Sequence, residues 1–248
     1  MERSQPRLPA WLVAATHAGL DLLFPPLCAG CERTGAHFCP TCAQAVEPLG
    51  HCICAQCGKP QAHPVFQCGD CQQNPSLLRL IRAATNHSGP LRHGIHSLKY
   101  ANRPELAVPL ARYLTVTFAQ PPWPSIHAIL DGVVPVPMHP ARLAERGYNQ
   151  AERLAGAFCR QVHLPLQTDW LQRQRATESQ VSLNRQQRRQ NVAGAFIASA
   201  AVRNKIILLI DDVYTTGATF HACAAAAHAA GASAVYALAL AAPLQVHF

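Results

Sequence analysis

Residues 206–219 read IILLIDDVYTTGAT, and this stretch decides the fold. Five consecutive apolar residues, 206–210, are typical of a strand that is buried on both faces of a parallel sheet. They lead directly into Asp211 and Asp212, two like charges that repel each other unless a ligand binds them. Residues 215–219, Thr-Thr-Gly-Ala-Thr, form a small-residue turn ahead of a predicted helix, where free backbone N–H groups favour a phosphate. A ribose 5′-phosphate satisfies both features, since carboxylates accept hydrogen bonds from sugar hydroxyls and also attract Mg²⁺.

The rest of the chain behind the cysteine-rich region alternates between strand and helix patterns. From about residue 78, apolar residues recur at helical spacing, and two helices are expected to begin near Pro104 and Asn149. Further buried strands are predicted over 128–137 and 234–241, and an alanine-rich helix over 217–230. Alternation of this kind predicts an α/β fold, a parallel sheet covered by helices on both faces. The ligand site of such a sheet lies beyond the carboxyl ends of its strands, where the acidic pair falls.

The cysteines point to metal rather than to disulfides. Nine of the eleven cysteines lie between positions 28 and 71, and the chain shows no export signal. Two Cys-x-x-Cys turns together supply the four thiolates of a closed, tetrahedral zinc site. The spacing predicts two structural Zn²⁺ sites, made by Cys28, Cys31, Cys39 and Cys42 and by Cys54, Cys57, Cys68 and Cys71. Cys52 is an alternative ligand to Cys54. Three nearby histidines are within reach as substitutes but are interpreted as ordinary loop residues: His37, His51 and His63.

The charge of the chain favours anionic ligands. The 248 residues carry a formal net charge of +8, from 21 Lys+Arg against 13 Asp+Glu. Two zinc sites with four thiolates each would add 2 − 4 = −2 per site and lower this to about +4. Nine arginines against four acidic residues between 142 and 189 leave a local net charge of +5, which suits diphosphates or single-stranded DNA. Residues 10–24 are too short and too polar to span a bilayer, and a short amphipathic helix is predicted there.

The motifs together resemble a known family. The segment IILLIDDVYTTGAT is similar to the phosphoribosyl-pyrophosphate (PRPP) loop of type I phosphoribosyltransferases. Ahead of it stand the Cys-x-x-Cys quartets, LKY at 98–100, VVPVPMHPARLAERGYNQ at 133–150 and SLNRQQRRQN at 182–191. This order resembles the ComF family of competence-associated, phosphoribosyltransferase-like proteins over nearly the whole chain.

The resemblance implies a type I phosphoribosyltransferase fold with a small N-terminal zinc-binding module. The implied organisation is an amphipathic helix over 1–26, a double zinc ribbon over 27–75 and a phosphoribosyltransferase-like domain over 78–248. Since the last predicted strand lies close to residue 248, a base-reading hood is expected from residues ahead of the sheet. By the same resemblance, the ribose and catalytic residues are expected to be Asp211 and Asp212, and the 5′-phosphate is expected to bind at Thr215, Thr216, Gly217, Ala218 and Thr219. The expected pyrophosphate loop consists of Pro135, Val136, Pro137 and Met138, with Arg142 and Arg146. A mobile or DNA-binding loop is expected to contain Arg185, Arg188 and Arg189, and a solvated helix face is the alternative for Arg188 and Arg189.

The resemblance also implies a function. A ComF-like protein is expected to bind PRPP with Mg²⁺ and to assist the internalisation of transforming single-stranded DNA. Its expected partners are a competence helicase or a DNA-uptake channel, and its expected location is the cytoplasm, including the inner face of the membrane. The alternative is an active phosphoribosyltransferase that transfers the ribosyl group to a nucleobase-like acceptor. No acceptor site or general base is identified, and His139 is interpreted as an ordinary loop residue.

Overall fold

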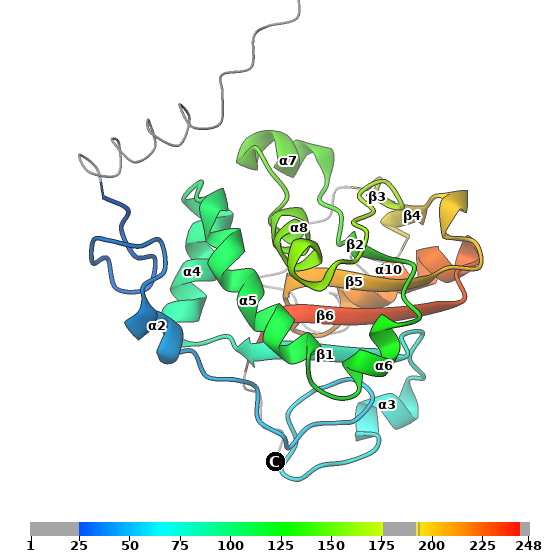
Figure 1. Ribbon diagram of the computed structural model, residues 1–248. Coiled ribbons are helices and arrows are strands. Elements are labelled where there is room, and N and C mark those ends of the chain that lie inside the picture. Colours follow the sequence, from blue (N-terminus) through cyan, green and yellow to red (C-terminus); the bar gives the residue numbers. More distant parts are fainter. Residues whose placement is uncertain (1–24, 176–191, 193, 244–248) are drawn as a thin grey trace, which may run out of the picture.

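The computed structural model describes residues 25–175, 192 and 194–243 (Figure 1). The N-terminal helix predicted over 1–26 falls almost entirely outside these residues, as do Arg185, Arg188 and Arg189. Within the described part of the chain, no helix has the length and apolar character needed to cross a membrane.

A four-stranded parallel sheet forms the centre of the molecule. Its strand order is β1-β6-β5-β2, and each neighbouring pair is parallel. The bounds are Leu80–Asn86 for β1, Gly132–Pro135 for β2, Ile206–Val213 for β5 and Ala234–Ala242 for β6. A separate antiparallel pair consists of β3 (Leu171–Arg173) and β4 (Phe196–Ala198). The predicted α/β class with a parallel sheet is therefore confirmed.

Helices cover both faces of this sheet because successive residues of a strand point to opposite sides. Leu208 and Ile210 of β5 pack in one core with the helices α4 (Gly89–Tyr100), α5 (Ala107–Phe118) and α8 (Gln150–Val162). Ile207 and Leu209 pack in a second core with α10 (Ala218–Ala229) and β4, on the other face (Figure 1). The remaining helical elements are short: α2 (Pro40–Gln44), α3 (Gly69–Gln73), η1 (Pro104–Leu106), α6 (Trp123–His127), α7 (Pro140–Arg146) and η2 (Ala200–Val202).

Two predicted strands have different limits in the structure. The strand expected over 128–137 is confined to β2, since α6 and the residues after it occupy the stretch before Gly132. The strand expected over 206–210 continues to Val213, because pairing with β6 extends through Asp211 and Val213. The acidic pair therefore lies among the last residues of β5 and not after the strand. The helix expected to begin near Asn149 is α8, and the side-chain oxygen of Asn149 caps it by accepting from the backbone N–H of Ala151.

The cysteine-rich segment wraps around the β1 edge of the sheet. The first four-cysteine group packs in the core with α4 and α5, whereas the second packs in the core with α10. Between them, the backbone pairs with β1: Leu49 N–H donates to the Ala84 carbonyl and Asn86 N–H to the Glu47 carbonyl. These bonds cover a strand edge that would otherwise present unpaired N–H and C=O groups. The segment therefore holds both faces of the sheet from one edge.

Candidate functional site

The acidic pair lies at the carboxyl end of β5 and has a cationic partner from another element. Asp212 is only 3% exposed, and its backbone N–H donates to Asp211 Oδ1 at 2.8 Å. Lys99, in the last turn of α4, places Nζ 2.8 Å from Asp212 Oδ2. Burial acts to lower the pKa of Lys99, but Asp212 and Asp211 raise it, so the amine keeps its proton. Lys99 belongs to the LKY segment at 98–100, but no role for this lysine follows from the local sequence.

One of the two carboxyl groups has unusual acid–base behaviour. Burial, together with the negative charge of Asp212, raises the pKa of Asp211 to about 8, whereas Lys99 acts in the opposite direction. The single positive charge of Lys99 therefore does not offset both carboxylates. A ligand that brings hydroxyl donors or further positive charge to this strand end would favour the ionised pair.

The turn behind the acidic pair is shaped by Gly217. This residue has φ +81°, a left-handed conformation, and caps the N-terminus of α10. A Cβ atom at Gly217 would lie 2.9 Å from the Tyr214 ring, which is buried beneath the turn. The Thr216 hydroxyl accepts from the N–H of Ala218 at 3.4 Å. The turn therefore lies at the N-terminus of α10, where the helix dipole favours an anion.

The predicted pyrophosphate loop adjoins the same strand end. The N–H of Val136 donates to the carbonyl of Ile210 at 2.9 Å, so the chain leaves β2 beside the acidic pair. The helix that follows, α7, carries Arg142 and Arg146 four residues apart and hence on one face. Loop 135–138 and the acidic pair thus lie side by side at the carboxyl ends of two neighbouring strands, β2 and β5.

A basic cleft of about 660 Å³ opens next to this edge. It is lined by Lys99 and Tyr100 from α4 and by Arg142 and Arg146 from α7, with Asn102, Glu145 and Gly147 among the other lining residues. The Arg146 guanidinium lies 5.1 Å from the Tyr100 ring centroid and donates to Gln150 Oε1. Three cationic side chains therefore converge on a space large enough for a small anion or a diphosphate.

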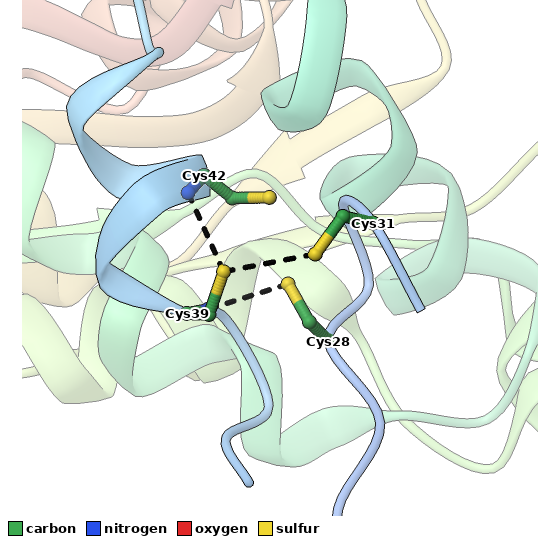
Figure 2. Close-up of side chains that lie close together, drawn as sticks. All are labelled: Cys28, Cys31, Cys39 and Cys42. Carbon is green, nitrogen blue, oxygen red and sulfur yellow. Dashed lines mark hydrogen bonds between the residues drawn. The ribbon is translucent and has the colours of Figure 1, made fainter. Parts of the chain in front are cut away.

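The first four-cysteine group has the geometry of a tetrahedral metal site (Figure 2). Its four sulfur atoms lie within 4.8 Å of one another, and Cys31 and Cys39 sulfurs are 3.7 Å apart. A zinc ion with four Zn–S bonds of about 2.3 Å places its sulfurs about 3.8 Å apart, whereas a disulfide needs about 2.05 Å. Although burial acts to raise it, backbone N–H donors from Cys39 and Gly30 lower the pKa of Cys28 to about 6. The residues therefore fit structural zinc.

The second four-cysteine group has the same geometry and is buried throughout. Sulfur separations are 3.7 Å for Cys57 and Cys68, 3.7 Å for Cys68 and Cys71, and 3.9 Å for Cys54 and Cys71. Cys52 is exposed and stands outside the group, so the structure selects Cys54 between the two alternatives. His37 is likewise outside both cysteine groups, and its Nδ1 lies 3.4 Å from Glu105 Oε1. Two tetra-cysteine sites, both consistent with structural zinc, are thus present in the described residues.

A cavity of about 520 Å³ lies between the second cysteine group and the turn at 215–219. It is lined by Cys57 and Cys71, by Tyr214 and Thr216, and by Phe196 of β4. The second cysteine group and the turn at 215–219 therefore face the same cavity.

Comparison with known proteins supports the family resemblance. The family model described as "Double zinc ribbon domain" matches residues 19–72. The chain is 31% identical over 202 residues to "DNA utilization protein YhgH" of Escherichia coli (strain K12), covering 80% of this chain and 88% of the relative. It is 30% identical to "Competence protein F" of Haemophilus influenzae, covering 79% of this chain and 81% of that one. The chain belongs to the ComF family. "Competence protein ComFC" of Bacillus subtilis is also 30% identical, with 74% of each chain covered.

Solved structures with some similarity to this ComF-family chain are phosphoribosyltransferases and a related enzyme. The glutamine PRPP amidotransferase of B. subtilis has a TM-score of 0.38 at 18% identity, covering 58% of this chain and 30% of that chain. A hypoxanthine phosphoribosyltransferase of Trypanosoma cruzi has a TM-score of 0.31 at 9% identity, covering 56% and 64%. The family assignment rests on the sequence relatives.

Proposed function

We propose that this ComF-family protein binds PRPP with Mg²⁺ at the carboxyl edge of the sheet and acts in the handling of single-stranded DNA during natural transformation. One observation carries the proposal: an acidic pair, a phosphate-type turn and a three-cation cleft adjoin one another at a single sheet edge. PRPP carries the groups that each of these needs, namely vicinal hydroxyls, a 5′-phosphate and a diphosphate.

Each part of the site has a defined task in this proposal. Asp211 and Asp212 accept hydrogen bonds from the ribose hydroxyls, and backbone N–H groups of 215–219 bind the 5′-phosphate. Arg142 and Arg146, with loop 135–138, bind the diphosphate through charge-assisted hydrogen bonds. Bound Mg²⁺ would supply positive charge that neutralises the diphosphate, and the acidic pair offers carboxylate oxygens for it. The two tetra-cysteine sites hold structural Zn²⁺, which stabilises the N-terminal module and adds no catalytic group.

The role in DNA handling rests on the names of the relatives and on charge. The relatives are named as competence or DNA utilization proteins. The stretch 142–189 carries a net charge of +5, and part of it, with Arg185, Arg188 and Arg189, lies outside the described residues. The phosphate backbone of single-stranded DNA would bind to this stretch. A protein partner, either a competence helicase or an uptake channel at the inner face of the membrane, would dock on the cysteine-rich segment.

An active phosphoribosyltransferase remains the alternative, and the basic cleft favours it. Arg142 and Arg146 line this cleft and would stabilise pyrophosphate as it leaves, which is the main electrostatic demand of the reaction. His139 accepts from the N–H of Ala141 and caps α7, so its ring has a structural task rather than that of a base. Pyrophosphate release from PRPP, measured with a panel of nucleobases, separates turnover from binding alone.

The DNA-binding part is tested by fluorescence anisotropy of a labelled single strand over a salt series. Replacing Arg185, Arg188 and Arg189 by glutamine is expected to weaken binding and to reduce the slope of log K against log salt by about 2, since each phosphate contact contributes about 0.7. Replacing Arg79, Arg112 and Arg203, three arginines outside the 142–189 stretch, is the charge-matched control. Equal affinities and slopes for both triple variants would contradict the assignment.

A further inference from the structure

Lys99 faces two regions of opposite charge. Its Nζ is 2.8 Å from Asp212 Oδ2, and its side chain is 20% exposed. The same residue lines the basic cleft together with Arg142 and Arg146. One ammonium group therefore has a carboxylate as its partner and an anion-attracting space beside it.

This position creates a competition for charge. A divalent cation or ribose hydroxyls bound at Asp212 would take over the carboxylate that Lys99 now neutralises. An anion in the cleft would offer Lys99 a second partner next to the two arginines. A lysine suits such an exchange, because its ammonium is a compact charge with three donors on a flexible four-carbon stem. An arginine at this place would be held in a rigid fork geometry and would exchange less readily.

We propose that Lys99 is an exchangeable counter-ion, which pairs with Asp212 in the ligand-free protein and binds the diphosphate when a cation occupies the acidic pair. The inference rests on the proposed function, since it assumes that the cleft takes a diphosphate. It goes further in making cation binding and diphosphate binding mutually favourable through one side chain. Each ligand releases the partner that the other needs, which is a reciprocal coupling between two adjacent sites.

The exchange is tested by calorimetric titration of inorganic pyrophosphate and, separately, of Mg²⁺ into Lys99→Met and wild-type protein. Lys99→Met is expected to bind pyrophosphate in Mg²⁺ buffer about 10- to 100-fold more weakly, the usual effect of losing one charged hydrogen bond. The same variant is expected to bind Mg²⁺ alone several-fold more tightly, because the competing ammonium is gone. The control is Lys205→Met, which breaks the pair of Lys205 with Asp131 (2.9 Å) at the opposite end of β5 and removes the same charge.

A second variant guards against misfolding of the first. Asp212→Asn removes the carboxylate that pairs with Lys99. In the absence of metal, this variant is expected to bind pyrophosphate more tightly than the wild-type protein does. The double variant Asp212→Asn/Lys99→Met should lose that gain in affinity. Opposite shifts for Mg²⁺ and pyrophosphate support the exchange. Provided that the wild-type protein binds both ligands, two results would contradict the exchange. One is weaker binding of both Mg²⁺ and pyrophosphate by Lys99→Met, and the other is equal affinities in Lys99→Met and Lys205→Met. Failure of wild type to bind pyrophosphate and PRPP under every condition would overturn the proposed function, and the exchange with it.

Discussion

Replacement of Cys54 by serine is expected to release one zinc ion per chain and to lower the melting temperature by well over 10 °C. Cys54 is fully buried, and its group shares a core with Ile81, Tyr214 and α10. Structural zinc contributes on the order of 10 kcal/mol to folding of small zinc modules, which is comparable to the whole stability of a typical domain. Loss of the ion also leaves the three remaining buried thiols, of Cys57, Cys68 and Cys71, without the metal. Circular dichroism melts with parallel zinc analysis measure both effects.

The control for this change is the neighbouring Cys52→Ser. Cys52 is exposed and lies outside the four-cysteine group, so its replacement should keep two zinc ions per chain and the wild-type melting temperature. Because Cys57 and Cys71 line a cavity with Tyr214 and Thr216, Cys54→Ser should also weaken the binding of phosphate ligands at the turn 215–219. Two zinc ions retained in Cys54→Ser, or a melt that metal removal leaves unchanged, would contradict the structural role.

Replacement of Gly217 by alanine is expected to abolish phosphate binding at the turn and to destabilise the protein by about 2–3 kcal/mol. The left-handed backbone of Gly217 costs a non-glycine residue about 1–2 kcal/mol. The added Cβ would also lie 2.9 Å from the buried ring of Tyr214, so the turn or the ring must shift. We expect the turn to change shape and its backbone N–H groups to lose their alignment for a phosphate. Melting temperature and ribose 5-phosphate binding measure the two consequences.

A matched glycine separates backbone strain from the contact. Gly194 also has a positive φ of +66°, but an added Cβ there meets nothing within 4 Å. Gly194→Ala is thus expected to lose only the stability that the strained backbone costs, and to bind the ligand as the wild-type protein does. In Gly217→Ala, a second substitution Tyr214→Ala should restore part of the binding, because it removes the ring that the Cβ meets. Wild-type binding in Gly217→Ala would show that the turn does not hold the phosphate.

Local patterns in the sequence account for much of this structure. The apolar run 206–210 predicted a buried parallel strand, and the Cys-x-x-Cys spacing predicted two tetra-cysteine groups, because each depends on residues that are close in the chain. Gly217 could likewise be predicted as a turn residue from its neighbours. These features need no knowledge of tertiary packing.

Other features depend on packing between distant segments and could not be read from local patterns. Lys99 precedes Asp212 by 113 positions, and their contact exists only because α4 brings its last turn to the end of β5. The preference for Cys54 over Cys52 follows from burial against the sheet, which two residues of equal type do not reveal. The separation of the cysteine groups onto opposite faces follows from the pairing of Leu49 with Ala84 along β1.

The most direct test of the central claim is calorimetric titration of PRPP into the wild-type protein, with and without Mg²⁺, beside the double variant Asp211→Asn/Asp212→Asn. We expect saturable, Mg²⁺-dependent binding by wild type and a loss of at least about 100-fold in the double variant, since two charged hydrogen-bond acceptors are removed at once. A circular dichroism melt of the variant confirms that it is folded. Absence of PRPP binding by wild type, or equal affinity in the double variant, would contradict the assignment of this sheet edge as a PRPP site.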